Sequence, residues 1–310
     1  MRRPRIKGDL MQSRTRKQAL SEGVTAGVFF GTAAIFIRFT QGFDTFSIVF
    51  WRLLIGCLAL VLLALVFRRA FQPRLVKQNL KELLILSLFL ALHFLLFTAA
   101  VKDTTILNAT ILVNTTPVFS MFVSSFVYRL RPSRIALLGL LVSFVGIMVI
   151  AYAETTGAKS ASENVSPNLK GDLEAVLAAV VEAFYLNYGR KVRNQMSVLS
   201  TMLPIYGFIA VFVGIASVSL GNTVSPFPLT LQSALPLIGL GLLPTAIAHT
   251  LYFSSLSNLK SFETSTLALL EPIGATILGI VIFQEIPAPI FALGAFMILA
   301  GMVFVVRKAS

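Results

Sequence analysis

Residues 114–146, NTTPVFSMFVSSFVYRLRPSRIALLGLLVSFVG, recur in outline 155 residues later as 269–301, LLEPIGATILGIVIFQEIPAPIFALGAFMILAG. The two stretches align without a gap. The residues that shape helices coincide in four pairs: Pro117 with Pro272, Pro132 with Pro287, Gly139 with Gly294 and Gly146 with Gly301. Both stretches are long, apolar and similarly punctuated, so they predict two copies of one helical unit.

Composition identifies the surroundings of these units. Apolar residues make up 56% of the 310 and charged residues 13%, with a mean hydropathy of +0.84, which is typical of an integral membrane protein. No alternating pattern of a β-barrel appears, so an all-α fold is expected. Ten apolar stretches are long enough to cross a bilayer, at 24–40, 46–67, 82–101, 105–127, 134–152, 173–189, 198–220, 231–256, 262–283 and 287–306.

The net charge of +13 follows this topology and does not indicate a nucleic-acid surface. Twenty-one of the 26 Lys and Arg residues fall on one side of a ten-span arrangement. The other side holds only Lys102, Lys159 and Lys170, while Arg38 and Arg52 lie within or at the ends of spans. The positive-inside rule therefore predicts a multi-pass protein of the cell membrane with both termini in the cytoplasm.

Ten spans divide into two halves of five. Because five is odd, the halves must cross the membrane in opposite senses, which predicts two inverted five-helix repeats. The expected organisation is a basic cytoplasmic tail at 1–23, a first repeat at 24–152, an extracytoplasmic linker at 153–172, a second repeat at 173–306 and a short cytoplasmic tail at 307–310. A signal peptide is the alternative for residues 1–22, but the first span is too long for one and lacks a cleavage site.

Pro117 and Pro272 lie near the middle of their spans, where each removes a backbone hydrogen bond. Matching breaks in both halves of a membrane protein point to the substrate site of a transporter. Thr115 and Thr116 precede the first break and could either bond the freed carbonyls or contact a ligand. The series Gly23, Gly27 and Gly31 predicts close helix packing, as do the paired glycines of the two stretches.

The sequence here resembles a known family. The stretch from Leu267 through Glu271-Pro272, Gln284-Glu285 and Gly294 to Gly301 looks like the end of an EamA-type domain of the drug/metabolite transporter superfamily, and Asn108 to Gly146 looks like an earlier copy. The resemblance implies ten spans around a central cavity and the export or exchange of small metabolites, often amino acids. One departure is visible, since Leu130 stands where the second copy has Glu285.

His93 and His249 are the only histidines, and they lie in matching helices of the two halves. A histidine titrates near neutral pH, so these two could gate, carry a proton or bind a zwitterionic substrate. Alternatively, each is a neutral ring that bonds a neighbouring helix. No carboxylate lies at metal-motif spacing beside either ring, which argues against zinc.

Glu182 and Glu271 are the carboxylates deepest in apolar runs, and either is a candidate proton carrier. Tyr185 and Tyr252 lie three residues after Glu182 and His249, on the same helix faces, and are candidates to line a pocket. Asn108 completes the predicted substrate-binding set of His93, Asn108, Thr115, Glu182, Tyr185, His249, Tyr252 and Glu271. Glu263, close to Lys260 at a span end, is expected to be a solvated mouth residue.

Arg38 and Arg52 lie toward the outer side of their spans. An ion pair or a snorkelling position is the ordinary fate of such residues. If both faced the cavity, an anionic substrate such as a phosphorylated sugar would become credible.

No nucleotide-binding loop, zinc-protease motif or nucleophile elbow appears, so we expect neither an enzyme nor a cofactor. We therefore predict a secondary transporter of small metabolites, with amino acids as the first class. A carrier of anionic metabolites and a pore-forming channel are the alternatives. The expected partners are a small-molecule substrate, the lipid bilayer and coupled protons, in a monomer or homodimer.

Overall fold

The computed structural model describes residues 15–40, 42–130, 132–156, 167–220, 224–225, 227–228, 230–283 and 288–307. Within these ranges the chain is helical and contains no strand, which confirms the all-α class. Residues 157–166 of the predicted linker, the pair Gln284-Glu285 and Pro287 lie outside the described residues.

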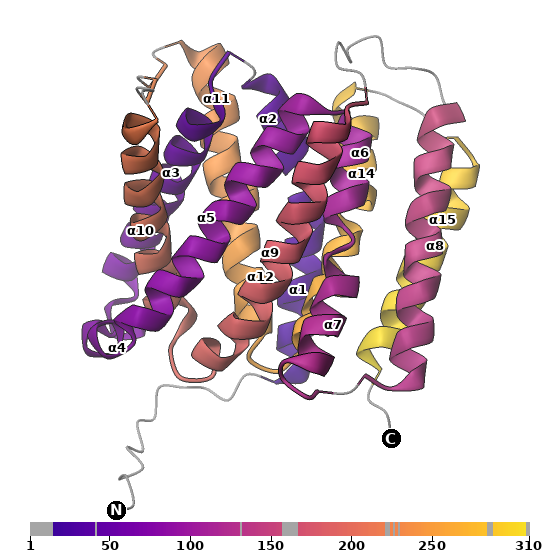
Figure 1. The fold of residues 1–310 in the computed structure, drawn as a ribbon, viewed down its shortest axis with the longest axis horizontal. Helices are drawn as coiled ribbons and strands as arrows, with labels where there is room; N and C mark the ends of the chain where they lie inside the picture. The colour runs from indigo at the N-terminus through magenta and orange to yellow at the C-terminus, as the bar shows by residue number, and fades with distance from the viewer. Residues whose placement is uncertain are drawn as a thin grey trace, which may run out of the picture.

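The helices of the first half are α1 (Arg16–Phe30), α2 (Ala33–Phe39), α3 (Thr45–Val66), η1 (Arg68–Ala70), α4 (Pro73–Gln78), α5 (Leu80–Asp103), α6 (Ile106–Val113), α7 (Thr116–Phe126) and α8 (Arg134–Thr156). Those of the second half are α9 (Leu169–Arg193), α10 (Val198–Ser219), α11 (Leu231–Leu240), η2 (Gly241–His249), α12 (Thr250–Ser255), α13 (Ser261–Leu267), η3 (Ala268–Leu270), α14 (Glu271–Phe283) and α15 (Ile290–Val306). Figure 1 shows them as a bundle in which α1 begins and α15 ends at the same end.

Seven helical segments are both long and apolar enough to cross a membrane: Arg16–Phe39, Thr45–Val66, Leu80–Asp103, Ile106–Phe126, Arg134–Ala153, Val198–Ser219 and Leu231–Ser255. Helix α15 is apolar but shorter. This number supports a multi-pass membrane protein, whereas the count of ten stays a prediction.

Short polar side chains mark where several helices begin. Asp44 accepts a hydrogen bond from the backbone N–H of Ser47 at the start of α3, and Thr105 accepts one from Asn108 at the start of α6. Ser197 does the same for α10. These caps satisfy backbone donors that a helix leaves without a partner at its first turn, and they fix where apolar helix gives way to loop.

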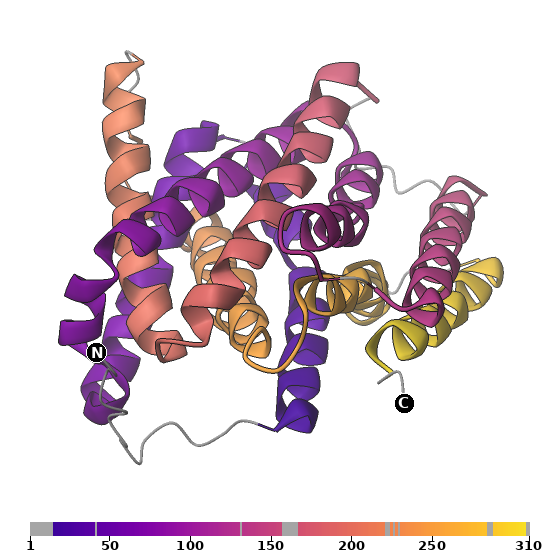
Figure 2. The ribbon, with the colours of Figure 1, turned by 60° about the horizontal axis from the view of Figure 1, so that its bottom comes forward.

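Helices α8 and α15 pack along each other at one edge of the bundle (Figures 1 and 2). Their seam is made of glycines: a Cβ on Gly139 would lie 2.6 Å from the carbonyl oxygen of Gly301, and one on Gly146 would lie 2.8 Å from that of Gly294. The predicted packing role of these glycines is therefore confirmed. Van der Waals contact between closely approaching backbones is a main source of helix association in lipid, so the seam depends on the missing side chains.

Helix α1 uses its own glycines to pack against the other half of the chain. Gly23 and Gly27 face Leu267, and Gly31 faces the backbone of Ala275 at the start of α14. In return α9, the first helix of the second half, packs against α5, α6 and α7. Each half thus inserts its first helix into the other.

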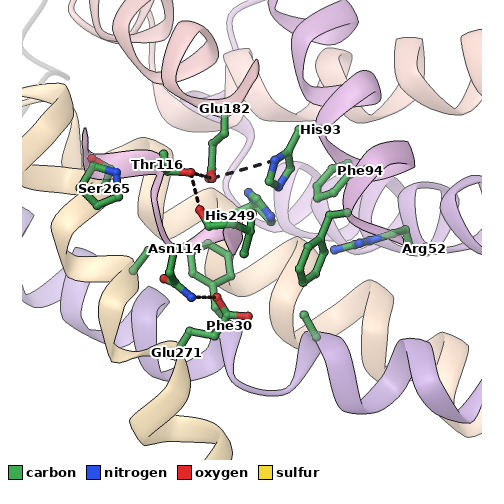
Figure 3. Close-up of a pocket in the computed structure, with 15 residues that line it drawn as sticks. Phe30, Arg52, His93, Phe94, Asn114, Thr116, Glu182, His249, Ser265 and Glu271 are labelled. Carbon is green, nitrogen blue, oxygen red and sulfur yellow. Dashed lines mark hydrogen bonds and ion pairs between the residues drawn. The ribbon is translucent and has the colours of Figure 1, made fainter. Parts of the chain in front are cut away.

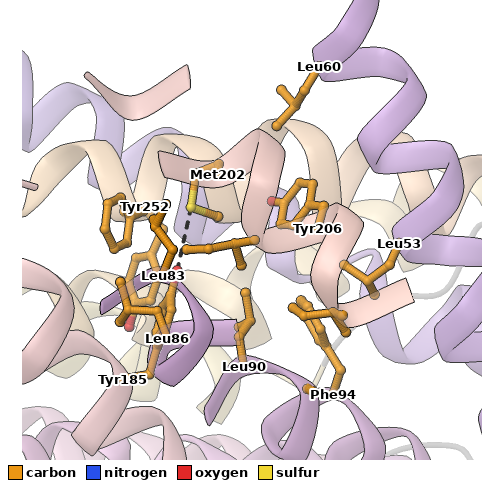
Figure 4. Close-up of a cluster of buried hydrophobic side chains, with 14 of the residues drawn as sticks. Leu53, Leu60, Leu83, Leu86, Leu90, Phe94, Tyr185, Met202, Tyr206 and Tyr252 are labelled. Carbon is orange, nitrogen blue, oxygen red and sulfur yellow. Dashed lines mark hydrogen bonds between the residues drawn. The ribbon is translucent and has the colours of Figure 1, made fainter. Parts of the chain in front are cut away.

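The largest apolar cluster joins α3, α5, α9, α10 and α12 (Figure 4). Leu86, Leu90 and Phe94 of α5 lie among Tyr185, Met202, Tyr206 and Tyr252, all of them buried. The cluster forms a dense wall on one side of the polar centre of the bundle.

Glu263 differs from its expected place in solvent. Its side chain is buried and forms an ion pair with Arg16, whose Nη2 lies 2.8 Å from the carboxylate. The same guanidinium donates to the carbonyl oxygens of Asn258 and Val306. Arg16 therefore ties the start of α1 to α13 and to the end of α15. The expected solvated position was wrong, because the partner that allows Glu263 to be buried is Arg16, which is distant in sequence, and not the neighbouring Lys260 side chain.

Alanine at Gly139 is expected to destabilise the protein by about 1–3 kcal/mol, since the added methyl group meets backbone on α15 that cannot move aside. A matched control is Gly207→Ala in α10, where the nearest atom is the Cys57 sulfur at 3.9 Å. Thermal unfolding of both purified variants in detergent measures the difference. Equal melting temperatures would show that the seam does not depend on close approach.

Candidate functional site

Two interrupted helices meet in the middle of the bundle. The break between α6 and α7 falls at Asn114-Thr115, directly before Thr116-Pro117, and the short 3₁₀ segment η3 falls directly before Glu271-Pro272. The two breaks touch, because Asn114 donates from Nδ2 to the Glu271 carboxylate over 3.0 Å. Both side chains are buried.

The polar residues of the first break also repair its backbone. Pro117 has no N–H for the carbonyl of Val113, and the Thr116 hydroxyl lies 2.8 Å from that oxygen. Thr115 bonds the carbonyl of Leu112, and Asn114 bonds that of Thr110. Of the two interpretations left open for the threonines, backbone repair holds for both, and Thr116 in addition faces the cavity.

Glu182 of α9 reaches the first break from the opposite half of the chain. Its Oε2 lies 3.0 Å from the Thr116 hydroxyl, which has only one proton to donate. Either Thr116 donates to an ionised Glu182, or a protonated Glu182 donates to Thr116 while Thr116 donates to Val113. The geometry accommodates a carboxyl proton without rearrangement.

The two histidines lie together in the site, with ring centroids 5.9 Å apart. His93 Nδ1 lies 3.1 Å from the carbonyl oxygen of Ala178 and 4.0 Å from Glu182. Since a carbonyl can only accept, Nδ1 carries the proton in this contact. His249 packs edge-on against Phe30 and Phe94, and its Nδ1 is buried without a partner in the described part of the chain.

These groups line one cavity (Figure 3). Its walls come from both halves of the chain: Phe30, Ala33, Arg52, His93, Phe94, Phe97, Val113, Asn114, Thr116, Pro117, Glu182, His249, Ser265, Ala268 and Glu271. The cavity combines carboxyl, imidazole, amide, hydroxyl and guanidinium groups with aromatic rings, which suits a small substrate that is both polar and apolar.

A second, mostly apolar cavity shares Glu271 with the first. It is lined by Gly31, between α1 and α2, and by residues of α2, α6, α8 and α14, and it extends to Ile106 and Leu107 at the first turn of α6. Pro272 lies in its wall. The second cavity therefore extends from Glu271 toward the first turn of α6. That turn lies at the end of the bundle opposite the start of α1 (Figure 1).

The structure brings together His93, Glu182, His249 and Glu271 of the residues predicted from sequence, with Pro117 beside them. The others lie elsewhere. Asn108 bonds Asp172 in the first turn of α9, Thr115 bonds the carbonyl of Leu112 in α6, and Tyr185 contacts the Met202 sulfur in the apolar cluster. Tyr252 lies behind the cavity wall, packed edge-on against Phe30.

Sequence reasoning did not include Asn114, Ser265 or Phe30 in the predicted substrate-binding set, and for Arg52 it expected an ion pair or a snorkelling position, with a cavity-facing anion site as the alternative. The helix breaks were the available signal for Asn114, because side chains next to a break face the space that it opens. Among the described residues, no three His, Cys, Asp or Glu side chains gather as a metal site.

The sequence of this chain is similar to those of known transporters. The model of the EamA-like transporter family matches residues 19–152 and again residues 169–307. The uncharacterized transporter YxxF of Bacillus subtilis is 25% identical over 298 residues, which cover 94% of this chain and 90% of that protein. An uncharacterized transporter of Archaeoglobus fulgidus is 27% identical over 287 residues, covering 92% and 95%.

The fold also has a solved counterpart. A crystal structure superimposes with a TM-score of 0.73 at 20% identity, over 94% of this chain and 96% of the other. That likeness concerns the fold alone, but the family match covers most of the sequence in two copies. The chain is a member of the EamA-like transporter family.

Proposed function

We propose that this protein is a secondary transporter that moves small metabolites, with amino acids as the first class, outward across the cytoplasmic membrane by alternating access. The observation that carries the proposal is the polar cavity where two broken helices meet, with the Asn114–Glu271 contact at its centre. Irregular backbone at membrane depth is tolerated where it is buried in protein or lines a cavity, and carriers use it to bind substrate.

We further propose that ten segments cross the membrane. Besides the seven long apolar segments, α9, the broken helix α13–α14 and α15 would cross. Helix α9 carries Lys170 and Asp172 at one end and Arg190, Lys191 and Arg193 at the other, so its charges sit where headgroups would lie. The short α15 pairs with α8 along its length, which gives it a partner within the bilayer.

The glycine seam supports an inverted repeat. At the offset of 155 residues, Gly139 corresponds to Gly294 and Gly146 to Gly301, yet Gly139 faces Gly301 and Gly146 faces Gly294. Such reciprocal contacts are what a two-fold axis produces. At its centre Ser143 donates to the carbonyl oxygen of Ile298, its own counterpart 155 residues away.

The charge distribution supports the orientation. Arg16 and Lys17 at the start of α1 and the basic residues in the last turn of α9 lie toward the same end of the bundle, which the positive-inside rule assigns to the cytoplasm. At that end the Arg16–Glu263 pair joins α1, α13 and α15. The second cavity leads from Glu271 toward the other end. We therefore assign the structure to a conformation closed toward the cytoplasm.

Counterflow in proteoliposomes tests the function, with a panel of amino acids and other metabolites and with or without a pH gradient. Glu271→Gln and His93→Ala should each lower the flux by about tenfold or more, because each removes a group that a polar substrate meets in the cavity. Glu174→Gln, a carboxylate beside Lys170 at the start of α9, is the matched control and should keep wild-type flux.

Two results would contradict this scheme. Full flux in both cavity variants would remove these residues from the site. Flux that neither saturates nor responds to internal substrate would indicate a channel instead of a carrier.

Loss of the Arg16–Glu263 pair should favour the cytoplasm-open conformation. In a Cys57→Ser background, the variant Ala268→Cys places a single thiol in the cavity wall, and its rate of reaction measures access to the cavity. Arg16→Gln or Glu263→Gln should make this cysteine react about tenfold faster with a membrane-impermeant maleimide added on the cytoplasmic side. A tenfold change corresponds to a loss of ~1.4 kcal/mol in the free energy that favours the closed conformation. Lys17→Gln, one residue away, is the control. Unchanged labelling in both variants would exclude the ion pair as a closure.

A further inference from the structure

Arg52 is the one guanidinium in the cavity wall, and it has no carboxylate within ion-pair distance in the described residues. Only 1% of the residue is exposed. Its Nη1 is buried and has no hydrogen-bond acceptor there. A buried charge without a partner costs several kcal/mol, so its presence at this depth calls for a role.

The contacts that Arg52 does make hold it in place without neutralising it. Its Nε donates over 3.0 Å to the hydroxyl of Thr245, which lies in the π-helical segment η2. Thr245 in turn donates to the carbonyl of Leu240, the last residue of α11. The guanidinium carbon lies 4.1 Å from the centre of the Phe94 ring. A cation–π contact of this kind is attractive, but it offsets only part of the cost of burying the charge.

The carboxyls of the cavity are engaged elsewhere. Glu271 accepts from Asn114, and Glu182 contacts Thr116 and His93. In Figure 3 Arg52 enters from one side of the cavity, and Glu182 and Glu271 lie toward the other. The cavity therefore presents a cation and a pair of carboxyls on different walls, with the two histidines between them.

The orientation of the fork decides what it can bind. With Nε committed to Thr245, the terminal Nη1 and Nη2 groups remain, and their parallel N–H bonds match the two oxygens of a carboxylate. A zwitterion would then place its carboxylate on Arg52 and its ammonium near Glu182 and Glu271. Each charge of the substrate would meet its opposite, and the buried guanidinium would gain its missing partner.

We propose that Arg52 is the carboxylate-binding residue of the substrate site and that it makes the transporter select amino acids over the corresponding amines. This inference rests on the proposed transport of amino acids and specifies which group recognises them. It also assigns the π-helical segment a role, since Thr245 holds the guanidinium from there.

Ligand-induced thermal stabilisation of the purified full-length protein in detergent tests the proposal. The probes are leucine, phenylalanine and glutamine, the amine that each becomes without its carboxylate, the acid that each becomes without its amino group, and inorganic phosphate. The variants are Arg52→Gln, Arg52→Lys and Arg38→Gln. Arg38 is the matched control, because it donates to the carbonyl of Thr104 and does not line the cavity.

We expect at least one amino acid to stabilise the wild type more than its amine does. Arg52→Gln should weaken binding of that amino acid by about 100-fold, as a lost charge-assisted bidentate contact of roughly 2.7 kcal/mol would. Its binding of the amine should stay unchanged, which also shows that the variant is folded. Arg52→Lys keeps the charge without the fork and should lose affinity to a smaller degree, while Arg38→Gln should match the wild type.

Three results would overturn the proposal: equal stabilisation by amino acid and amine in the wild type, undiminished amino-acid binding in both Arg52 variants, or equal loss of amino acid and amine in both. If no amino acid binds but an acid or phosphate binds through Arg52, transport of amino acids fails while an anion site at Arg52 stands. If no probe binds the wild type, both proposals fail.

Discussion

The constraint on which the structure depends is that a backbone carbonyl in the membrane interior needs a donor. Pro117 and Pro272 each withhold one, from Val113 and Ala268. The two halves solve this differently: the Thr116 hydroxyl bonds Val113, whereas the N–H of Glu271 closes a 3₁₀ turn onto Ala268. The second solution uses only backbone, so the Glu271 side chain is free to face the cavity. Both halves thus lack the same backbone hydrogen bond but replace it in different ways, and the site between them is asymmetric although the sequence is repeated.

Close packing then holds the two defects against each other. Gly23, Gly27 and Gly31 let α1 approach the second break, and α9 brings Glu182 to the first. Because each half inserts its first helix into the other, the cavity wall is shared, and relative movement of the halves would change its shape. The α8–α15 seam lies apart from the cavity at the bundle edge, where it can join the halves without entering the site (Figure 2).

Much of this was predictable from one sequence, because the membrane restricts what a chain can do. The lengths of the apolar stretches predicted the helices, and the aligned prolines predicted the two breaks. Titratable residues within apolar stretches identified His93, Glu182, His249 and Glu271, which the structure brings together. Contacts between distant residues were not predictable. Asn108 bonds Asp172, and Glu263 bonds Arg16, which is 247 residues away in the sequence. No local sequence pattern predicts either partner. Tyr185 and Tyr252 each lie one helical turn after a site residue, on the same helix face. Even so, their side chains pack in the apolar cluster and do not line the cavity.

Arg52 shows the same limit from the other direction. In sequence it is an arginine near a span end, for which an ion pair or a snorkelling position is the ordinary expectation. In space it is buried under Phe94 and held by Thr245, 193 residues away, so that reaching water would break both contacts. A buried charge without a partner among the described residues lowers the stability of the fold. That cost is recovered when an anion enters, and an amine that lacks the anion cannot recover it, so the same unfavourable burial becomes a means of discrimination.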